Sequence, residues 1–310
     1  AVSGGSDSLC LAYFSRIYSL EFKNKIHVLI VDHKLRKESH KEAIKVKRIL
    51  KRTKIPSTIL TWKGKIPKTN IQKNARNIRY SLISNYCVKK RIKYIVTAHH
   101  GDDQIENFFI RLFRGSGLTG LSSMSESFNY NNNLKIIRPF LSFKKMDLHN
   151  ITLQYFKNFI SDPSNEDEKY LRVRVRKIRN SMEKEGLDTS KIINTINNLF
   201  SAHKALSYYK NIALHKHVSF LSKNKCQISE KIFTQEAGEI IFKSFSDIFS
   251  LISGKYYPPR SKKIINLINR LKKNVLSKST LGGCIIEKKG SVIFVFKENK
   301  EKKLAFQANK

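Results

Sequence analysis

SGGSDS, at residues 3–8, is a glycine- and serine-rich stretch that carries one acidic residue. Apolar residues recur at helical spacing directly after it, which predicts that a helix begins here. Adjacent glycines let the backbone approach an anion closely, hydroxyl groups donate hydrogen bonds to phosphate oxygens, and the first turn of a helix offers unpaired N–H groups. We therefore interpret the stretch as a nucleotide-binding loop, with a turn that caps a core helix as the alternative. The residues assigned to it are Ser3, Gly4, Gly5, Ser6, Asp7 and Ser8.

Two common phosphate-binding motifs are missing from the chain. There is no GxxxxGK[ST] sequence, whose lysine reaches the β and γ phosphates, and no GxGxxG sequence of the dinucleotide type. Hydroxyl groups therefore take the place of the lysine in this loop. Only two residues precede the loop, so the strand expected to lead into it is barely present, and the sequence has the appearance of a fragment.

The composition is that of a globular chain with a strong positive charge. The 310 residues include 60 Lys and Arg against 24 Asp and Glu, which gives a formal net charge of +36, and 40% of the residues are hydrophobic. This charge favours a polyanionic partner, first of all nucleic acid, with biased nucleotide usage as an alternative source of so much lysine. No apolar run approaches the roughly 18 residues of a membrane span and no secretory signal is visible, so we expect no membrane partner and a cytoplasmic location. The four cysteines form no CxxC pair, which argues against a disulfide framework, a zinc site or an iron–sulfur site.

Apolar runs alternate with helical patterns in the first half of the chain. Residues 26–31 and 93–98 are typical of buried parallel strands. Helical patterns at 37–54 and 71–91 and a short strand at 57–62 lie between them. This alternation predicts a doubly wound α/β fold with a mostly parallel sheet, in which ligands bind beyond the carboxyl ends of the strands.

The remainder of the chain predicts a second, mainly helical region. Residues 115–135 are rich in glycine, serine and asparagine and too long for an ordinary connection, so we expect a mobile lid or a substrate-facing loop. Residues 281–297 are typical of a β-hairpin. We expect a nucleotide-binding catalytic domain at residues 1–185 and a substrate-binding region at residues 186–310 that ends in this hairpin.

Residues 99–106, HHGDDQIE, gather three carboxylates and two imidazoles within a strongly basic chain. If a helix begins at Asp102, then Asp102 and Glu106 share one face, with Asp103 beside them. Helix capping explains one carboxylate but not three together with two histidines. Paired carboxylates can hold the Mg²⁺ that bridges ATP phosphates, or a substrate ammonium group, whereas zinc is disfavoured because thiols are absent.

Further candidates follow from their positions. Asp32 ends the first apolar run, where it can bind a metal or a ribose, with a turn-forming role as the alternative. Arginine pairs three residues apart share a helical face and can bind phosphate, with a solvated face as the alternative. The arginines assigned to phosphate or RNA are Arg76, Arg79, Arg111, Arg114, Arg172, Arg174 and Arg176.

Taken in order, these motifs resemble one family. SGGSDS resembles the PP-loop of ATP pyrophosphatases, which cleave ATP between the α and β phosphates. The full set resembles the bacterial tRNA(Ile)-lysidine synthetase family over roughly residues 1–180: SGGSDS, VDHKLR (31–36), NARNIRY (74–80), TAHHGDDQIEN (97–107), RLFRGSGLTGL (111–121), RPF (138–140), DPSN (162–165) and YLRVRVR (170–176). The sequence departs from the family pattern where Lys34 replaces a usual glycine, Asn107 a usual threonine and Val173 a usual asparagine.

The resemblance implies an activity and its substrates. The wobble cytidine of a CAU-anticodon tRNA(Ile) would be converted to lysidine with ATP, Mg²⁺ and L-lysine, so that the tRNA reads AUA and accepts isoleucine. With this activity we assign the PP-loop, Asp32 and His99 to ATP, and Asp32 and Asp103 to Mg²⁺. Asp102 and Glu106 are assigned to the lysine amine, and Arg111 and Arg114 to phosphate or RNA. The sequence leaves the oligomeric state open, a homodimer included.

Three other functions compete with this interpretation. A tRNA thiolase of the same fold would need paired cysteines, which the chain lacks. A synthetase that acts on a small molecule would not need the basic C-terminal half, where residues 251–280 hold eight Lys and Arg and no acid. A non-enzymatic RNA-binding protein would leave the carboxylate cluster and the PP-loop without a role.

Overall fold

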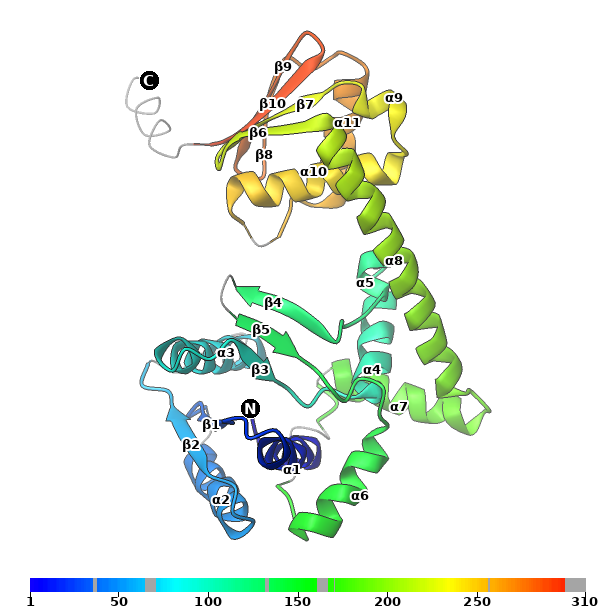
Figure 1. The fold of residues 1–310 in the computed structure, drawn as a ribbon. Coiled ribbons are helices and arrows are strands. Elements are labelled where there is room, and N and C mark those ends of the chain that lie inside the picture. Colours follow the sequence, from blue (N-terminus) through cyan, green and yellow to red (C-terminus); the bar gives the residue numbers. More distant parts are fainter. Residues whose placement is uncertain are drawn as a thin grey trace. The chain divides into compact units, whose positions relative to one another are not determined.

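The computed structural model describes residues 1–35, 38–64, 71–131, 134–160, 167–169, 171–255 and 257–298. The chain divides into two compact units, Ala1–Phe200 and Ser201–Lys310 (Figure 1). The division falls inside helix α8 (Thr189–His217), which is continuous across it. The boundary expected near residue 185 precedes this helix and stays a prediction. None of the helices in the described residues has both the length and the apolar character that a membrane crossing requires.

The strands of the first unit are short and mostly parallel. β1 (Val28–Asp32) pairs in parallel with β2 (Ser57–Thr61). β3 (Tyr94–Val96) pairs in parallel with β5 (Leu134–Ile137), and β4 (Ser127–Asn131) runs antiparallel to β5. The predicted mostly parallel sheet is confirmed, with one antiparallel strand at its edge.

Residues 1 and 2 lie between these two groups of strands. The backbone N–H of Val2 donates to the carbonyl oxygen of Leu29 at 2.8 Å. The amino group of Ala1 donates to the carbonyl oxygen of Val96 at 3.1 Å. The nucleotide-binding loop at residues 3–8 therefore leaves the sheet between β1 and β3.

Helices cover both faces of this sheet, because successive β1 side chains point to opposite sides. Val28 and Ile30 pack into a core with helices α1, α2 and α6, whereas Leu29 packs into a second core with α3. The prediction of a doubly wound fold is thus confirmed. The helices of the first unit and the start of the long connecting helix are α1 (Ser6–Glu21), α2 (Ser39–Arg52), α3 (Ile71–Lys89), α4 (Gly101–Leu112), α5 (Leu118–Leu121), α6 (Lys145–Phe156), α7 (Leu171–Lys184) and α8.

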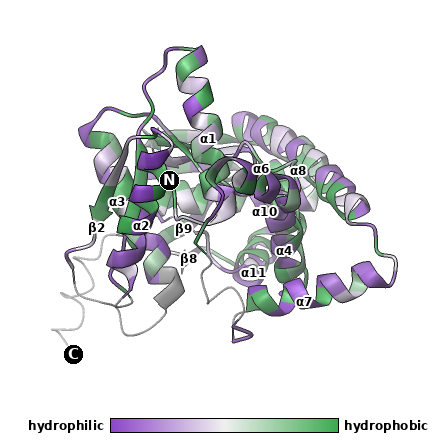
Figure 2. Cartoon of the chain, turned by 90° about the horizontal axis from the view of Figure 1, so that it is seen from below, coloured by the Kyte–Doolittle hydropathy of each residue, from purple (hydrophilic) through white to green (hydrophobic). Residues whose placement is uncertain are grey.

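Helices α4, α7 and the first part of α8 form a further packed group. Ile105 and Phe109 of α4 share a small core with Val175 of α7 and with Ile192 and Ile196 of α8. Polar and apolar stretches alternate along α7 and α8 in Figure 2, as expected for helices that bury one face. This group places α7 directly against the acidic helix α4.

The stretch at residues 115–135 differs from the mobile loop expected there. Its described part contains α5 and β4, and Gln104 of α4 holds the connection between them. The Gln104 side-chain amide donates to the carbonyl oxygen of Met124 at 2.8 Å and accepts from the Met124 N–H at 2.9 Å. The composition of the stretch suggested a mobile loop because composition does not reveal that a buried side chain is hydrogen-bonded to this backbone.

The second unit is an antiparallel sheet packed on helices. The order β6-β7-β10-β9-β8 contains the hairpin predicted at residues 281–297, which is confirmed as β9 and β10. The strands are β6 (Val218–Ser222), β7 (Lys225–Ser229), β8 (Lys278–Leu281), β9 (Cys284–Lys289) and β10 (Val292–Lys297), and the helices are α9 (Ile232–Gln235), α10 (Gly238–Ser253) and α11 (Ser261–Lys272).

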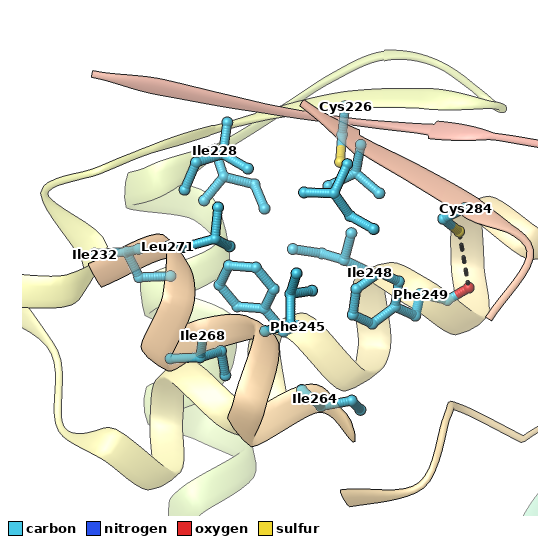
Figure 3. Close-up of a cluster of buried hydrophobic side chains, with 14 of the residues drawn as sticks. Cys226, Ile228, Ile232, Phe245, Ile248, Phe249, Ile264, Ile268, Leu271 and Cys284 are labelled. Carbon is cyan, nitrogen blue, oxygen red and sulfur yellow. Dashed lines mark hydrogen bonds between the residues drawn. The ribbon is translucent and has the colours of Figure 1, made fainter. Parts of the chain in front are cut away.

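The core of the second unit follows from helical periodicity. Ile264, Leu267, Ile268 and Leu271 of α11 recur at three- and four-residue spacing and are buried. Figure 3 shows Ile264, Ile268 and Leu271 gathered with Phe245 and Phe249 of α10 beneath the sheet. The exposed side of α11 carries Lys262, Lys263 and Arg270, so the basic stretch noted in the sequence lies on a solvated helix face.

Candidate active site

The loop at residues 3–8 is held by its own serine. The Ser8 hydroxyl accepts hydrogen bonds from the N–H groups of Ser3 and Gly4, both at 3.1 Å, and donates to the carbonyl oxygen of Gly5 at 3.0 Å. Ser8 is buried, while Ser3 is exposed. Ser8 therefore shapes the loop, and Ser3 is the hydroxyl that a ligand can reach.

Gly4 is required where the loop approaches helix α2. Its φ is 97°, a left-handed conformation that favours glycine. A Cβ atom at this position would lie 2.5 Å from Cγ2 of Val46. Gly5 precedes α1 as its N-cap and has no side chain to satisfy the first-turn N–H groups, which makes this helix start suited to an anion.

His100 connects the loop to the acidic helix. Its Nε2 lies 3.5 Å from Oδ2 of Asp7 at the start of α1 and 3.5 Å from Oδ2 of Asp103 in the first turn of α4. Burial would lower the pKa of His100, but Asp7, Asp103 and Asp102 outweigh it and raise that pKa above 6.5. Burial would likewise raise the pKa of Asp7, but His100, Ser6 and Lys145 lower it below 3.8. The predicted nucleotide loop and the predicted acidic cluster are thus brought together at the His100 side chain.

This arrangement predicts a pH-dependent stability. The stabilisation from His100 is complete below a pH of about 6.5, the unfolded-state pKa of histidine, and is lost as the pH rises through the higher folded-state value. We expect the urea midpoint of the protein, without nucleotide or metal, to fall more steeply from pH 6 to about 9 than that of His100→Gln. Parallel pH profiles for the two proteins would contradict this coupling.

Asp32 is completely buried at the end of β1, where it organises its own turn. Its carboxylate accepts hydrogen bonds from the Ser39 hydroxyl at 2.6 Å, the Lys34 N–H at 3.1 Å and Nδ1 of His40 at 2.9 Å. Burial would raise the pKa of Asp32, but these donors lower it below 3.8. Lys34 itself has a φ of 51°, which explains why glycine suits this position.

Arginines of α7 neutralise the acidic cluster. Arg172 donates from Nε to Oε2 of Glu106 at 2.7 Å and from Nη2 to Oδ1 of Asp103 at 2.8 Å. Arg176 donates from Nε to Oε1 of Glu106 at 2.7 Å. The Glu106 side chain is only 2% exposed, whereas that of Asp103 is 16% exposed. The structure therefore places Arg172 and Arg176, which we assigned to RNA, in ion pairs inside the site.

The remaining acidic and basic candidates surround this core. Asp102 is 23% exposed and lies 3.3 Å from Nη1 of Arg179. Arg111 donates to the carbonyl oxygen of Gly120 at 2.7 Å and thus ties α4 to α5. The predicted phosphate- or RNA-binding residues on the surface of the first unit are Arg76, Arg79, Arg114 and Arg174.

The Glu106 ion pairs predict a large contribution to stability. Glu106→Gln leaves Arg176 without its anionic partner and Arg172 with Asp103 alone, and we expect the free energy of unfolding to fall by about 2–4 kcal/mol. The measurement is urea unfolding followed by circular dichroism. Glu168→Gln is the matched control, because the Glu168–Lys177 pair is 61% and 62% exposed. Loss of that pair is expected to cost less than about 1 kcal/mol, and equal effects of the two variants would contradict the prediction.

Arg138 is a buried site residue that we did not assign from the sequence. It follows β5 directly, is 6% exposed, and donates from Nη1 to the carbonyl oxygen of Ser125 at 2.8 Å. His99, which follows β3, lies close enough for Arg138 to affect its titration. Burial lowers the pKa of His99 to about 4, with Arg138, Arg76 and Arg172 adding to the effect and Asp103 opposing it. For Arg138, the available signal was the RPF motif (138–140) in which it lies.

The site offers carboxylate oxygens that suit Mg²⁺. Among the described residues, no group of three histidine, cysteine, aspartate or glutamate side chains is arranged to hold a metal ion. Mg²⁺ in nucleotide sites is commonly held by one or two carboxylates together with substrate phosphates. Asp7 and Asp103, on either side of His100, are placed next to the loop in this way. Asp32 already accepts hydrogen bonds from three donors. It therefore fits a role in positioning the turn after β1 at least as well as a role in binding Mg²⁺.

Other cavities and thiols do not add chemistry. A cavity of about 710 Å³ is lined mainly by apolar side chains, among them Leu11, Phe14, Ile83 and Ile95, and by no carboxylate. All four cysteines are buried and unpaired. Burial raises the pKa of Cys10 and Cys284 to about 11 and of Cys226 to about 12, and it also raises the pKa of Cys87. These thiols have the character of core residues.

Comparison with known proteins identifies the family. Residues 1–182 match the PP-loop domain family. A tRNA(Ile)-lysidine synthase of Orientia tsutsugamushi (strain Boryong) is 36% identical over 305 residues, which cover 96% of this chain and 69% of the relative. The chain belongs to the tRNA(Ile)-lysidine synthase family. A tRNA(Ile)-lysidine synthase of Wolbachia pipientis wMel is also similar, at 35% identity over 302 residues that cover 96% of this chain and 70% of the relative.

A solved structure confirms the fold of this family member. The U34-tRNA thiolase NcsA from Methanococcus maripaludis with its [4Fe-4S] cluster matches with a TM-score of 0.52 and 16% identity, covering 64% of this chain and 71% of the thiolase. At this identity the likeness concerns the fold alone. The thiolase alternative is not favoured, since the lysidine synthase relatives match nearly the whole chain.

Proposed function

We propose that this enzyme joins L-lysine to C2 of the wobble cytidine of a CAU-anticodon tRNA(Ile), with consumption of ATP. The observation that carries the proposal is the His100 bridge, which places the PP-loop and the acidic cluster in one site. The names of the similar proteins support the substrate, and the charge of +36 suits a polyanionic RNA. With a tRNA substrate, we place the reaction in the cytoplasm.

The reaction divides into two transfers. The cytosine O2 attacks the α-phosphate of ATP, the bond between the α-phosphorus and the bridging oxygen breaks, and diphosphate leaves with its electron pair. The ε-amine of lysine then attacks C2, the C2–O2 bond breaks, and AMP leaves with the oxygen. The amine gives up a proton in the second transfer. Lysidine, AMP and diphosphate are the products.

The PP-loop supports the first transfer. Its N–H groups at the start of α1 and the exposed Ser3 hydroxyl can donate to the departing diphosphate, where negative charge develops. Mg²⁺ held by Asp103 with Asp7 or Asp32 would supply charge neutralisation at the phosphates. His100 Nε2 lies between the carboxylates of Asp7 and Asp103, 3.5 Å from each, and can hold both next to the loop.

The acidic cluster supports the second transfer. The lysine ε-amine has a pKa of about 10.4 and must lose its proton before it attacks. Asp102 is 23% exposed and can receive the ammonium group, with Asp103, which is 16% exposed and paired with Arg172, beside it. Glu106, enclosed by Arg172 and Arg176, holds the cluster in place. Arg76, Arg79, Arg114 and Arg174 are exposed and can contact the RNA backbone.

A single labelling experiment tests the proposal. The protein is incubated with ATP, Mg²⁺ and radiolabelled lysine, with the CAU-anticodon tRNA or the same tRNA carrying a uridine at the wobble position. We expect label in the first RNA and none in the second, with one AMP released for each lysine incorporated. No label in the cytidine tRNA would reject the proposed function, and label in both would reject the wobble cytidine as the target.

A further inference from the structure

Arg138 is a buried cation without an anionic partner among the described residues. Its guanidinium lies over the ring of Phe128 at 4.7 Å and donates to one carbonyl oxygen, that of Ser125. Its Nε is buried and has no hydrogen-bond partner, and no carboxylate in the described part of the chain lies within ion-pair distance. An uncompensated buried charge is costly, because the lost hydration is not replaced. Such a group is expected where a ligand completes the site.

More positive charge surrounds Arg138. Burial lowers the pKa of Arg138, and Arg76 and Arg111 lower it further, while Tyr80 and Asp103 oppose them. Arg172 already occupies the Asp103 carboxylate. The neighbouring His99 stays neutral near pH 7, since burial, Arg138, Arg76 and Arg172 lower its pKa to about 4. The arginines thus outnumber the available carboxylates at the ends of β3 and β5.

Arg76 is near enough to Arg138 to lower its pKa. Its guanidinium lies over the ring of Tyr80 at 4.9 Å, and its Nη2 is 3.4 Å from the Tyr80 hydroxyl. Tyr80 is only 8% exposed and stacks on Tyr130 of β4 at 5.4 Å, which fixes the ring that carries Arg76. A rigid aromatic support lets a guanidinium keep its planar set of donors directed at a ligand.

We propose that Arg138 and Arg76 form a binding site for one phosphate group of a bound substrate, beyond the carboxyl ends of β3 and β5. Phosphate matches the site because it presents several acceptor oxygens and enough charge for two guanidinium groups. The phosphate can come from the ATP chain or from the RNA backbone next to the target base. The site deepens the proposed function and rests on it for the identity of these two substrates.

The test compares three charge-removing variants by binding alone. Arg138→Gln and Arg76→Gln each remove one cation of the site, and Arg16→Gln on α1 removes a cation elsewhere in the first unit. Affinity for ATP with Mg²⁺ is measured by calorimetry. Affinity for an RNA hairpin with a CAU anticodon loop is measured over a range of salt concentrations.

We expect Arg138→Gln and Arg76→Gln to lower the affinity for one and the same ligand by about tenfold or more. The affinity of Arg16→Gln is expected to stay within about twofold of that of wild type. Loss of ATP affinity assigns the phosphate to ATP. Loss of affinity for the hairpin, with the slope of log affinity against log salt concentration reduced by about one, assigns the phosphate to RNA. Unchanged affinity for both ligands would overturn the proposal.

Two further controls separate the possible failures. If Arg138→Gln does not fold, the test rests on Arg76→Gln, which replaces an exposed side chain and must still lose affinity. In addition, inorganic diphosphate or the hairpin must raise the melting temperature of wild type but not that of Arg76→Gln. If wild type binds phosphate through these arginines yet incorporates no lysine, the phosphate site stands while the proposed function is rejected.

Discussion

Replacing Asp103 with asparagine is expected to abolish ATP-dependent incorporation of lysine into RNA and to leave the affinity for the tRNA nearly unchanged. The Asp103 carboxylate accepts a hydrogen bond from the backbone N–H of His100, lies 3.5 Å from Nε2 of the His100 imidazole, and pairs with Arg172. Asparagine keeps the shape but removes the charge that a metal ion and a protonated amine require. We expect the rate to fall on the order of 10³-fold.

The affinity for tRNA is the second part of this result. Many phosphate contacts on a strongly basic chain supply that affinity, so the loss of one carboxylate has little effect on it. Asp188→Asn is the matched control, because the exposed Asp188 caps the start of α8 through its hydrogen bond from the Ser190 N–H, and asparagine caps equally well. An active Asp103→Asn enzyme would reject the catalytic assignment. A variant that loses tRNA binding would move Asp103 to the RNA interface.

Replacing Gly4 with alanine is expected to remove ATP binding and to destabilise the first unit. Alanine is strained at a φ of 97°, and its Cβ would lie 2.5 Å from Cγ2 of Val46. Backbone strain of this kind costs about 1–3 kcal/mol, and the contact adds to it by pushing the loop away from α2. We expect affinity for ATP with Mg²⁺ to fall by about 100-fold, as measured by calorimetry.

A second substitution separates the two causes. Gly4→Ala/Val46→Ala removes the close contact but keeps the backbone strain, so thermal unfolding is expected to show a partial recovery relative to Gly4→Ala. Gly238→Ala is the control, since its Cβ would have no neighbour within 4 Å. Normal ATP binding by Gly4→Ala would show that this loop does not hold the phosphates.

Buried parallel strands were predictable because they are continuous apolar runs. The ends of β1 and β3 lie within two residues of the predicted ends, and hydrophobic periodicity also indicated α2 and α3. Strands β6 and β7, in contrast, lie in the region that the sequence predicted to be mainly helical. Four of the five residues of β6 are exposed, so the strand has no apolar alternation that a sequence can display.

The members of the site were more predictable than their partners. The motifs indicated the loop and the carboxylates, but 66 residues separate Glu106 from Arg172, and a pairing at that distance depends on how α7 packs against α4. The density of arginines in α7 therefore suggested RNA contact, although three of them, Arg172, Arg176 and Arg179, lie in ion pairs with acids. Arg138 was overlooked because its burial is a property of the fold and cannot be read from local sequence.

The burial of every native cysteine makes the chain suitable for site-specific labelling. Thiols with a pKa near 11 or 12 remain protonated at neutral pH and react poorly with maleimides. A single new cysteine on an exposed position can then carry a fluorophore or spin label without removal of Cys10, Cys87, Cys226 or Cys284. One label on each unit would report directly, in solution, how the distance across α8 responds when tRNA binds.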